Sequence, residues 1–148
     1  MIDIIIPIYN TRSTLRKTLM SVCTQTVIDK IKVYLVDDCS TEDYDDILDE
    51  YKDKINLKYK KLESNVGSGL ARNYALKNTD SDYVIFLDAD DCFYATDSVE
   101  KLYKTIREGF DYVSGFSVIE KDNTYCDNIS DLHGKIYRRE FLFDNKIF

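Results

Sequence analysis

Hydrophobic positions in this chain fall into two patterns that alternate from the N-terminus onward. Short continuous apolar runs end in polar residues, as buried strands of a parallel sheet do. Between them, apolar residues recur every three or four positions, which is typical of one face of an amphipathic helix. We expect strands at residues 2–8, 31–36, 57–62, 83–87 and 111–119, the third of them nearer an edge of the sheet because of its lysines.

Helices are expected in the segments between these strands. Their apolar stripes cover residues 15–23, 47–51, 70–75 and 99–106. Ser40-Thr41-Glu42-Asp43 resembles a capping box that would open the second helix. The alternation predicts an α/β fold, in which a mostly parallel central sheet is flanked by helices. Residues 135–143 have the pattern of a strand that turns into a helix.

Composition narrows the classes of protein that fit. The 148 residues include 27 acidic and 20 basic side chains, for a net charge of −7. This length suits a single domain. The acidic balance argues against a nucleic-acid partner, because proteins that bind the phosphate backbone usually carry an excess of Lys and Arg. No apolar stretch approaches the roughly 20 residues that cross a bilayer, and the N-terminus lacks a signal-peptide pattern. We therefore expect a cytoplasmic location and no transmembrane segment.

Polar residues gather where the predicted strands end. Tyr9 and Asn10 follow the first strand, Asp37 and Asp38 close the second, and residues 88–91 follow the fourth. Ligands of open α/β sheets bind outside the carboxyl ends of the strands. The sequence therefore predicts a binding site at this edge of the sheet.

Asp88 and Asp90 are the strongest candidates for a metal site. If the chain leaves the strand extended, both carboxylates point the same way and repel each other. A divalent cation such as Mg²⁺ or Mn²⁺ would relieve the repulsion and keep phosphate oxygens as its remaining ligands. The alternative is that Asp90 and Asp91 only form a turn or cap a helix, and the same alternative holds for the aspartates of the second strand.

A glycine-containing segment, residues 65–73, precedes the third helix. Gly67 and Gly69 could serve backbone geometry alone. Arg72, however, is expected in the first turn of that helix, where backbone N–H groups and a guanidinium could both meet a phosphate. The segment thus adds a candidate anion site to the same edge.

Taken together, four blocks of sequence resemble the family 2 glycosyltransferases of GT-A fold, a Rossmann-like fold. Their order and spacing both match, and they are Ile4-Ile5-Ile6-Pro7-Ile8-Tyr9-Asn10, Val36-Asp37-Asp38-Cys39-Ser40, Asn65-Val66-Gly67-Ser68-Gly69-Leu70-Ala71-Arg72-Asn73 and Phe86-Leu87-Asp88-Ala89-Asp90-Asp91. The resemblance implies an enzyme that moves a sugar from a nucleoside diphosphate, most often UDP, to an acceptor hydroxyl with inversion. The implied acceptor is a glycan or glycolipid in the synthesis of a bacterial surface polysaccharide or glycolipid.

The resemblance also implies a role for individual residues. Pro7 and Tyr9 would bracket the uracil ring, and Asp38 would hydrogen-bond its edge. Asp88 would contact the ribose, and Arg72 would lie near the diphosphate. The metal ligand would be Asp90, and the supporting residues would be Asn10, Gly67 and Asp91.

Two further expectations concern the extent of the chain. Residues 1–97 would form the nucleotide-sugar-binding part, and residues 98–148 an incomplete start of the acceptor side. The general base of the family is a carboxylate that we expect beyond Phe148, so this chain is expected to bind donor but to transfer little. Asp127 and Asp131 are candidates only by proximity, and His133 fits a packing role better. Peripheral attachment at the inner face of the membrane is the expectation for a longer protein.

Three alternatives remain open at this point. A module could bind a nucleotide sugar without catalysis. A receiver-like signalling domain also carries acidic residues at strand ends, although its acidic pair normally follows the first strand, which here ends in Tyr9-Asn10. A phosphatase of the haloacid dehalogenase type would need Thr or Val where Cys92 stands.

Overall fold

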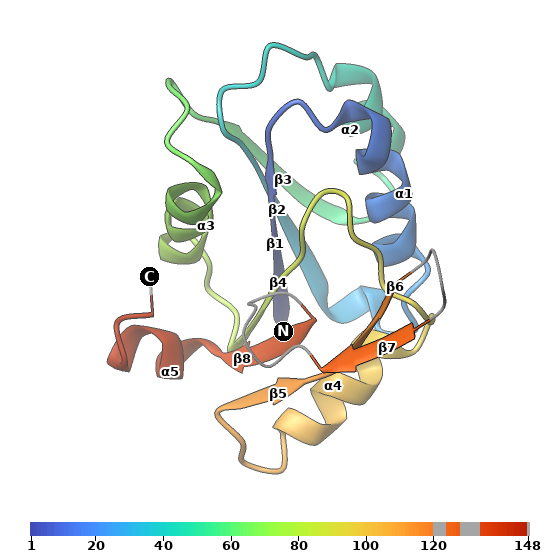
Figure 1. Cartoon of the computed structure of the whole chain (residues 1–148), viewed down its shortest axis with the longest axis vertical. Coiled ribbons are helices and arrows are strands. Elements are labelled where there is room, and N and C mark those ends of the chain that lie inside the picture. The colour runs from blue at the N-terminus through green and yellow to red at the C-terminus, as the bar shows by residue number, and fades with distance from the viewer. Residues whose placement is uncertain (120–123, 128–133, 148) are drawn as a thin grey trace.

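The structure, a computed structural model, describes residues 1–119, 124–127 and 134–147 (Figure 1). The first half of the chain alternates strands and helices as predicted. Its elements are β1 (Ile2–Ile8), α1 (Arg12–Cys23), η1 (Ile28–Lys30), β2 (Ile31–Asp37), α2 (Asp45–Tyr51), β3 (Asn56–Lys61), α3 (Ser68–Lys77) and β4 (Tyr83–Phe86). The remaining elements are α4 (Ser98–Ile106), β5 (Tyr112–Ser114), β6 (Phe116–Ile119), β7 (Thr124–Asp127), β8 (Lys135–Arg138) and α5 (Arg139–Asp144).

The main sheet has six strands in the order β3-β2-β1-β4-β8-β5. Strands β1 to β4 run parallel, whereas β8 is antiparallel to both of its neighbours. The predicted mostly parallel sheet is therefore confirmed, with β3 at one edge as expected. The pattern over residues 135–143 is confirmed as well, because β8 leads directly into α5.

The expected strand over residues 111–119 is wrong as a single element. It divides at Gly115, whose backbone N–H donates to the carbonyl of Gly134 at 2.9 Å. Before this point β5 joins the main sheet, and after it β6 pairs with β7 in a separate two-stranded sheet. Periodicity could not separate the two strands, because both are short apolar runs.

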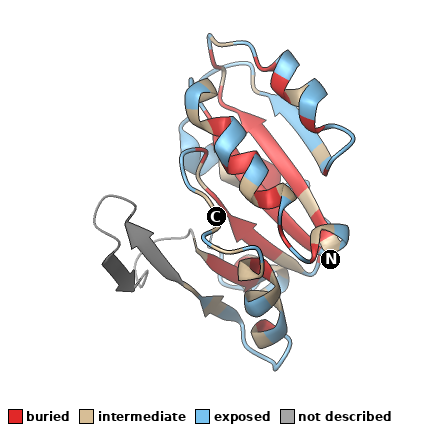
Figure 2. Ribbon diagram, turned by 90° about the vertical axis from the view of Figure 1, so that its right-hand side faces the viewer, coloured by how far each residue is buried: buried red, intermediate tan, exposed pale blue. Residues whose placement is uncertain are grey.

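Helices cover both faces of the sheet, with α1 and α2 on one face and α3 on the other (Figure 1). Each face has its own apolar cluster, the larger of which is centred on Ile4, Leu19 and Ile47. Every residue of β1 is buried, as the red central strands of Figure 2 show. Burial on both sides explains why this strand has a continuous apolar run rather than an alternating pattern.

The start of α2 differs from the predicted capping box. The helix begins at Asp45, and its first N–H is bound by Asp43 Oδ1 at 2.7 Å. Ser40 cannot cap it, because the Ser40 hydroxyl accepts a hydrogen bond from the backbone N–H of Asn10 at 3.0 Å. A contact with a distant loop has thus displaced the local motif that the sequence suggested.

None of the described helices is both long and apolar enough to cross a bilayer. The longest of them is α1, with 12 residues.

Candidate active site

The loops that follow β1 to β4 leave the sheet at the same end, which is the upper end in Figure 1. The loops after β1, β2 and β4 line a pocket of about 220 Å³ together with the start of α3. Its lining includes the predicted binding residues Pro7, Tyr9, Asp38, Arg72, Asp88 and Asp90. The supporting residues Asn10, Gly67 and Asp91 are each adjacent in sequence to a lining residue but do not line the pocket themselves.

Asn10 fixes the loop that presents Tyr9. Its φ of 52° lies in the left-handed region, which Asn tolerates better than most residues do. The Asn10 side-chain oxygen accepts hydrogen bonds from the backbone N–H and the hydroxyl of Thr41, at 3.0 and 3.1 Å. These contacts join the loops after β1 and β2 and leave the ring of Tyr9 half exposed at the pocket.

Asp38 is more deeply buried than a residue that only contacts a ligand needs to be. It is 2% exposed, and its two oxygens accept from the backbone N–H groups of Val66 and Gly67 at 2.7 and 2.8 Å. Gly67 has a φ of 88°, so it takes a conformation that L-residues rarely adopt. Asp38 therefore anchors the segment that leads into α3, and its predicted contact with a base stays a prediction.

Arg72 and Asp88 form an ion pair across the pocket. Arg72 comes from α3 and lies a full turn beyond the helix start at Ser68, not in the first turn as expected. Its Nε is buried and has no hydrogen-bond partner in the described part of the chain. The ion pair connects two walls of the pocket. It places the positively charged guanidinium of Arg72 next to the acidic residues.

The acidic residues after β4 form a turn rather than an extended segment. The backbone N–H of Asp91 donates to the carbonyl of Asp88 at 3.1 Å. The chain therefore does not leave β4 extended, which was the condition for the two carboxylates to point the same way, although Asp88 and Asp90 still line the same pocket. Asp90 is exposed, and within residues 1–119, 124–127 and 134–147 no hydrogen bond or ion pair engages its carboxylate.

The acidic side chains of the pocket do not make up a complete metal site by themselves. No cluster of three or more His, Cys, Asp or Glu in the described ranges is arranged to hold a metal ion. The residues at the pocket supply hard carboxylate oxygens, which Mg²⁺ and Mn²⁺ prefer, from Asp88 and Asp90. The donor set therefore fits a cation that also takes ligands from a phosphate-bearing molecule.

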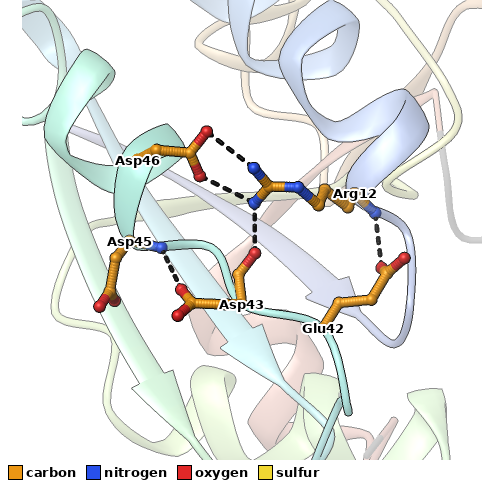
Figure 3. Close-up of a pocket in the computed structure, with 5 residues that line it drawn as sticks. All are labelled: Arg12, Glu42, Asp43, Asp45 and Asp46. Atoms are coloured by element: carbon orange, nitrogen blue, oxygen red, sulfur yellow. Dashed lines mark hydrogen bonds and ion pairs between the residues drawn. The ribbon is translucent and has the colours of Figure 1, made fainter.

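A second cavity, of about 460 Å³, lies between α1 and the start of α2 (Figure 3). The Arg12 guanidinium donates to both carboxylate oxygens of Asp46 at 2.8 Å and also to the carbonyl of Asp43. The backbone N–H of Arg12 donates to Glu42 at 3.0 Å. These paired charges connect the starts of the two helices, so we assign this cavity a structural role.

Acid stability offers a test of this ion-pair network. Hydrogen bonds from Arg12 and then Arg16 hold the pKa of Asp46 well below its ordinary value. A depressed pKa stabilises the folded state at pH values above about 4, and this contribution is lost as the pH falls toward the folded value. Asp46→Asn should therefore lower the thermal midpoint slightly at pH 7, and the difference from the unmodified chain should shrink on acidification and in 1 M salt. A difference that grows below pH 4 would contradict this assignment.

Several lining residues were not predicted from the sequence, among them Thr11 and Ser68. Thr11 directly follows the block that ends at Asn10, and Ser68 lies within the glycine-containing segment but was given no role there. The base candidates Asp131 and His133 lie outside the described residues, as do Phe148 and the side chain of Asp127.

Residues 3–147 match the sequence model of glycosyl transferase family 2. The chain belongs to this family. The match favours the glycosyltransferase interpretation over the receiver-like and phosphatase alternatives. It also confirms the family that the four blocks of sequence pointed to.

Individual relatives support the same assignment. The poly(ribitol-phosphate) beta-N-acetylglucosaminyltransferase TarS of Staphylococcus aureus is 39% identical over 91 residues, which cover 60% of this chain and 16% of TarS. The glycosyltransferase GlyA of Streptococcus pneumoniae is 34% identical over 149 residues, which cover 97% of this chain and 21% of GlyA. The chain therefore spans only a small part of these curated relatives.

Solved structures confirm the GT-A fold. The crystal structure of TarS residues 1–349 with UDP-GlcNAc superposes with a TM-score of 0.86 at 28% identity, over 99% of this chain and 48% of that one. The mannosyltransferase PcManGT of Pyrobaculum calidifontis, in complex with GDP-Man and Mn²⁺, has a TM-score of 0.83 at 21% identity, over 97% of this chain and 46% of that one. At that identity the second likeness concerns the fold alone.

Proposed function

We propose that this chain carries the donor site of an inverting glycosyltransferase. The donor that it binds would be a nucleoside diphosphate sugar, most favourably a UDP-sugar. The observation that carries the proposal is the pocket in which an exposed aromatic ring, an arginine and three aspartates meet at the carboxyl ends of the parallel strands. The complex of TarS with UDP-GlcNAc supports the choice of nucleotide.

The pocket offers complementary chemistry along its length. Tyr9 and Pro7 provide apolar surface for a base, next to the buried Asp38. Asp88 can accept a hydrogen bond from a ribose hydroxyl. Arg72 can exchange its pair with Asp88 for a phosphate oxygen, because a guanidinium binds phosphate as well as carboxylate.

The exposed carboxylate of Asp90 is the proposed metal ligand. A Mg²⁺ or Mn²⁺ ion bound there would offset the negative charge that develops on the departing diphosphate. The Mn²⁺ in the PcManGT complex, a protein of the same fold, supports a divalent cation. Asp91 would help to keep the turn in shape, because its N–H closes the turn.

The division of labour along the chain is also a proposal. Residues 1–97 would bind the donor, and residues 98–148 would begin the acceptor side. The general base that removes the proton from the acceptor hydroxyl would come from outside these 148 residues, and the acceptor would be a glycan or a glycolipid at the inner face of the membrane. Efficient sugar transfer by the 148-residue chain alone would contradict this placement of the base.

Calorimetric titration of the chain with UDP tests the donor site. We expect UDP to bind in the presence of Mn²⁺ and to bind more weakly in EDTA, because Asp90 would hold a cation that also attracts the diphosphate. Uridine, which lacks the diphosphate, should bind weakly and should show no response to Mn²⁺. Failure of every nucleoside diphosphate to bind in a metal-dependent manner would overturn the proposal.

A further inference from the structure

The loop between β4 and α4 carries the acidic turn, and helix α1 holds it along its length. Between Phe86 and Ser98 the chain has no helix or strand. The hydroxyl of Thr18 donates to the carbonyl of Ala89 at 2.8 Å, and the Ser21 hydroxyl accepts from the backbone N–H of Phe93 at 3.1 Å. Gln25 donates to the carbonyl of Ala95 at 2.9 Å. Side chains on and just after α1 thus substitute for the backbone partners that the loop lacks.

Thr18 has a special place among these contacts. It is fully buried on the face of α1 where Leu15, Leu19 and Val22 are also buried. A hydroxyl on an otherwise apolar helix face loses its hydration on folding, so it must bond to a protein group to offset that loss. Its partner is the carbonyl of Ala89, which is 71 positions away in sequence.

The carbonyl of Ala89 belongs to the peptide unit that also contains the N–H of Asp90. Because a peptide unit is planar, fixing its carbonyl also fixes the direction of the following Cα. The hydroxyl of Thr18 therefore sets the orientation from which the Asp90 carboxylate extends into the pocket. No hydrogen bond or ion pair of the Asp90 side chain in the described part of the chain does so.

We propose that Thr18 is a positioning residue for Asp90, which it orients for binding a divalent cation together with a nucleoside diphosphate. The inference rests on the proposed function, in which Asp90 is a metal ligand. Outer residues that orient a metal ligand contribute about 10- to 100-fold to metal affinity. Loss of the Thr18 hydroxyl should leave the base and ribose contacts intact and weaken only the metal-dependent part of nucleotide binding.

Three variants of the whole chain test this role, each titrated with UDP in Mn²⁺ and in EDTA. Thr18→Val keeps the side-chain shape but removes the hydroxyl, and we expect it to weaken binding in Mn²⁺ about tenfold with no change in EDTA. Thr18→Ser keeps the hydroxyl and should restore binding in Mn²⁺. Thr79→Val is the control, since Thr79 is also buried and lies before the amino end of β4. Its hydroxyl donates to the carbonyl of Leu76 at 2.6 Å and accepts from Arg139 Nε at 3.1 Å.

Thermal unfolding separates positioning from stability. Both valine variants should lower the midpoint, but only Thr18→Val should change the response to Mn²⁺. Equal binding by Thr18→Val and the unmodified chain would overturn the role of Thr18, and so would an equal loss in Thr79→Val. If Thr18→Val does not fold, Ser21→Ala serves instead, with an expected loss in Mn²⁺ of about threefold because Ser21 bonds farther along the loop. Absence of Mn²⁺-dependent binding in the unmodified chain would instead overturn the proposed function.

Discussion

Replacement of Asp90 by Asn should weaken UDP binding in Mn²⁺ by about 100-fold or more. The amide keeps the size of the side chain but lacks the negative charge that attracts a hard cation. The amide oxygen is also a weaker donor to the metal than a carboxylate oxygen, so the diphosphate would lose the bridge between itself and the protein. The effect should be confined to the metal-dependent part of binding, because the base and ribose contact other residues of the pocket.

The fold should not change in Asp90→Asn, since no hydrogen bond or ion pair within the described ranges engages this carboxylate. Calorimetry in Mn²⁺ and in EDTA measures UDP binding with and without the metal-dependent contribution. Circular dichroism measures the thermal midpoint. Asp49→Asn is the charge-matched control, because Asp49 lies on α2 and pairs with Lys52 at 2.9 Å, away from the pocket. Asp90→Asn binding as tightly as Asp49→Asn in Mn²⁺ would exclude Asp90 as the metal ligand.

Much of the candidate site could be predicted because it depends on topology. Parallel strands bring their carboxyl ends to one edge, so the polar residues after β1, β2 and β4 had to lie near each other once the strands were recognised. Tyr9, Asp38 and Asp88 were found in this way, and all line the pocket. The family resemblance then supplied roles for them, which the topology alone could not.

Other features depend on contacts between distant segments and left no local signal. Ser40 has the sequence of a helix cap, but a loop 30 positions away takes its hydroxyl. The pairing of Arg72 with Asp88, and of Thr18 with the loop after β4, likewise depends on which helix packs beside which strand. Local propensity yields to such contacts because each satisfies a group that the fold has removed from water.

Replacement of Asp37 by Ala should cause the largest loss of stability, about 2–4 kcal/mol, since it leaves the buried N–H of Ser40 and the partly buried hydroxyl of Tyr59 without their acceptor. Asp37 closes β2 and is fully buried. Its oxygens accept from the backbone N–H of Ser40 at 2.7 Å and from the hydroxyl of Tyr59 at 2.8 Å, and Lys61 lies 3.6 Å away. Cys39, which lies between Asp37 and Ser40 in sequence, has a φ of 64°. The Asp37 carboxylate therefore holds a strained turn closed.

For a chain of this length the expected fall in thermal midpoint is roughly 5–12 °C. Asp37→Ala should also weaken UDP binding, because the turn that it closes carries Asp38, the anchor of the segment before α3. Tyr59→Phe is the matched partial variant, and it should cost only about 1 kcal/mol because it removes a single hydrogen bond. A cost in Asp37→Ala no greater than that in Tyr59→Phe would show that the turn closes without the carboxylate.

The pH dependence of stability in Tyr59→Phe tests whether the folded state holds the Tyr59 phenol protonated. Burial, and then the hydrogen bond to Asp37, raise the pKa of Tyr59 well above its ordinary value. The folded state therefore holds this proton more tightly than the unfolded chain, in which tyrosine ionises near pH 10. The stability that follows is complete below about pH 10 and is lost as the pH rises toward the folded pKa. Chemical unfolding between pH 8 and pH 11 should show this loss in the unmodified chain and a smaller one in Tyr59→Phe, and equal losses in the two would mean that the folded state does not hold the phenol protonated.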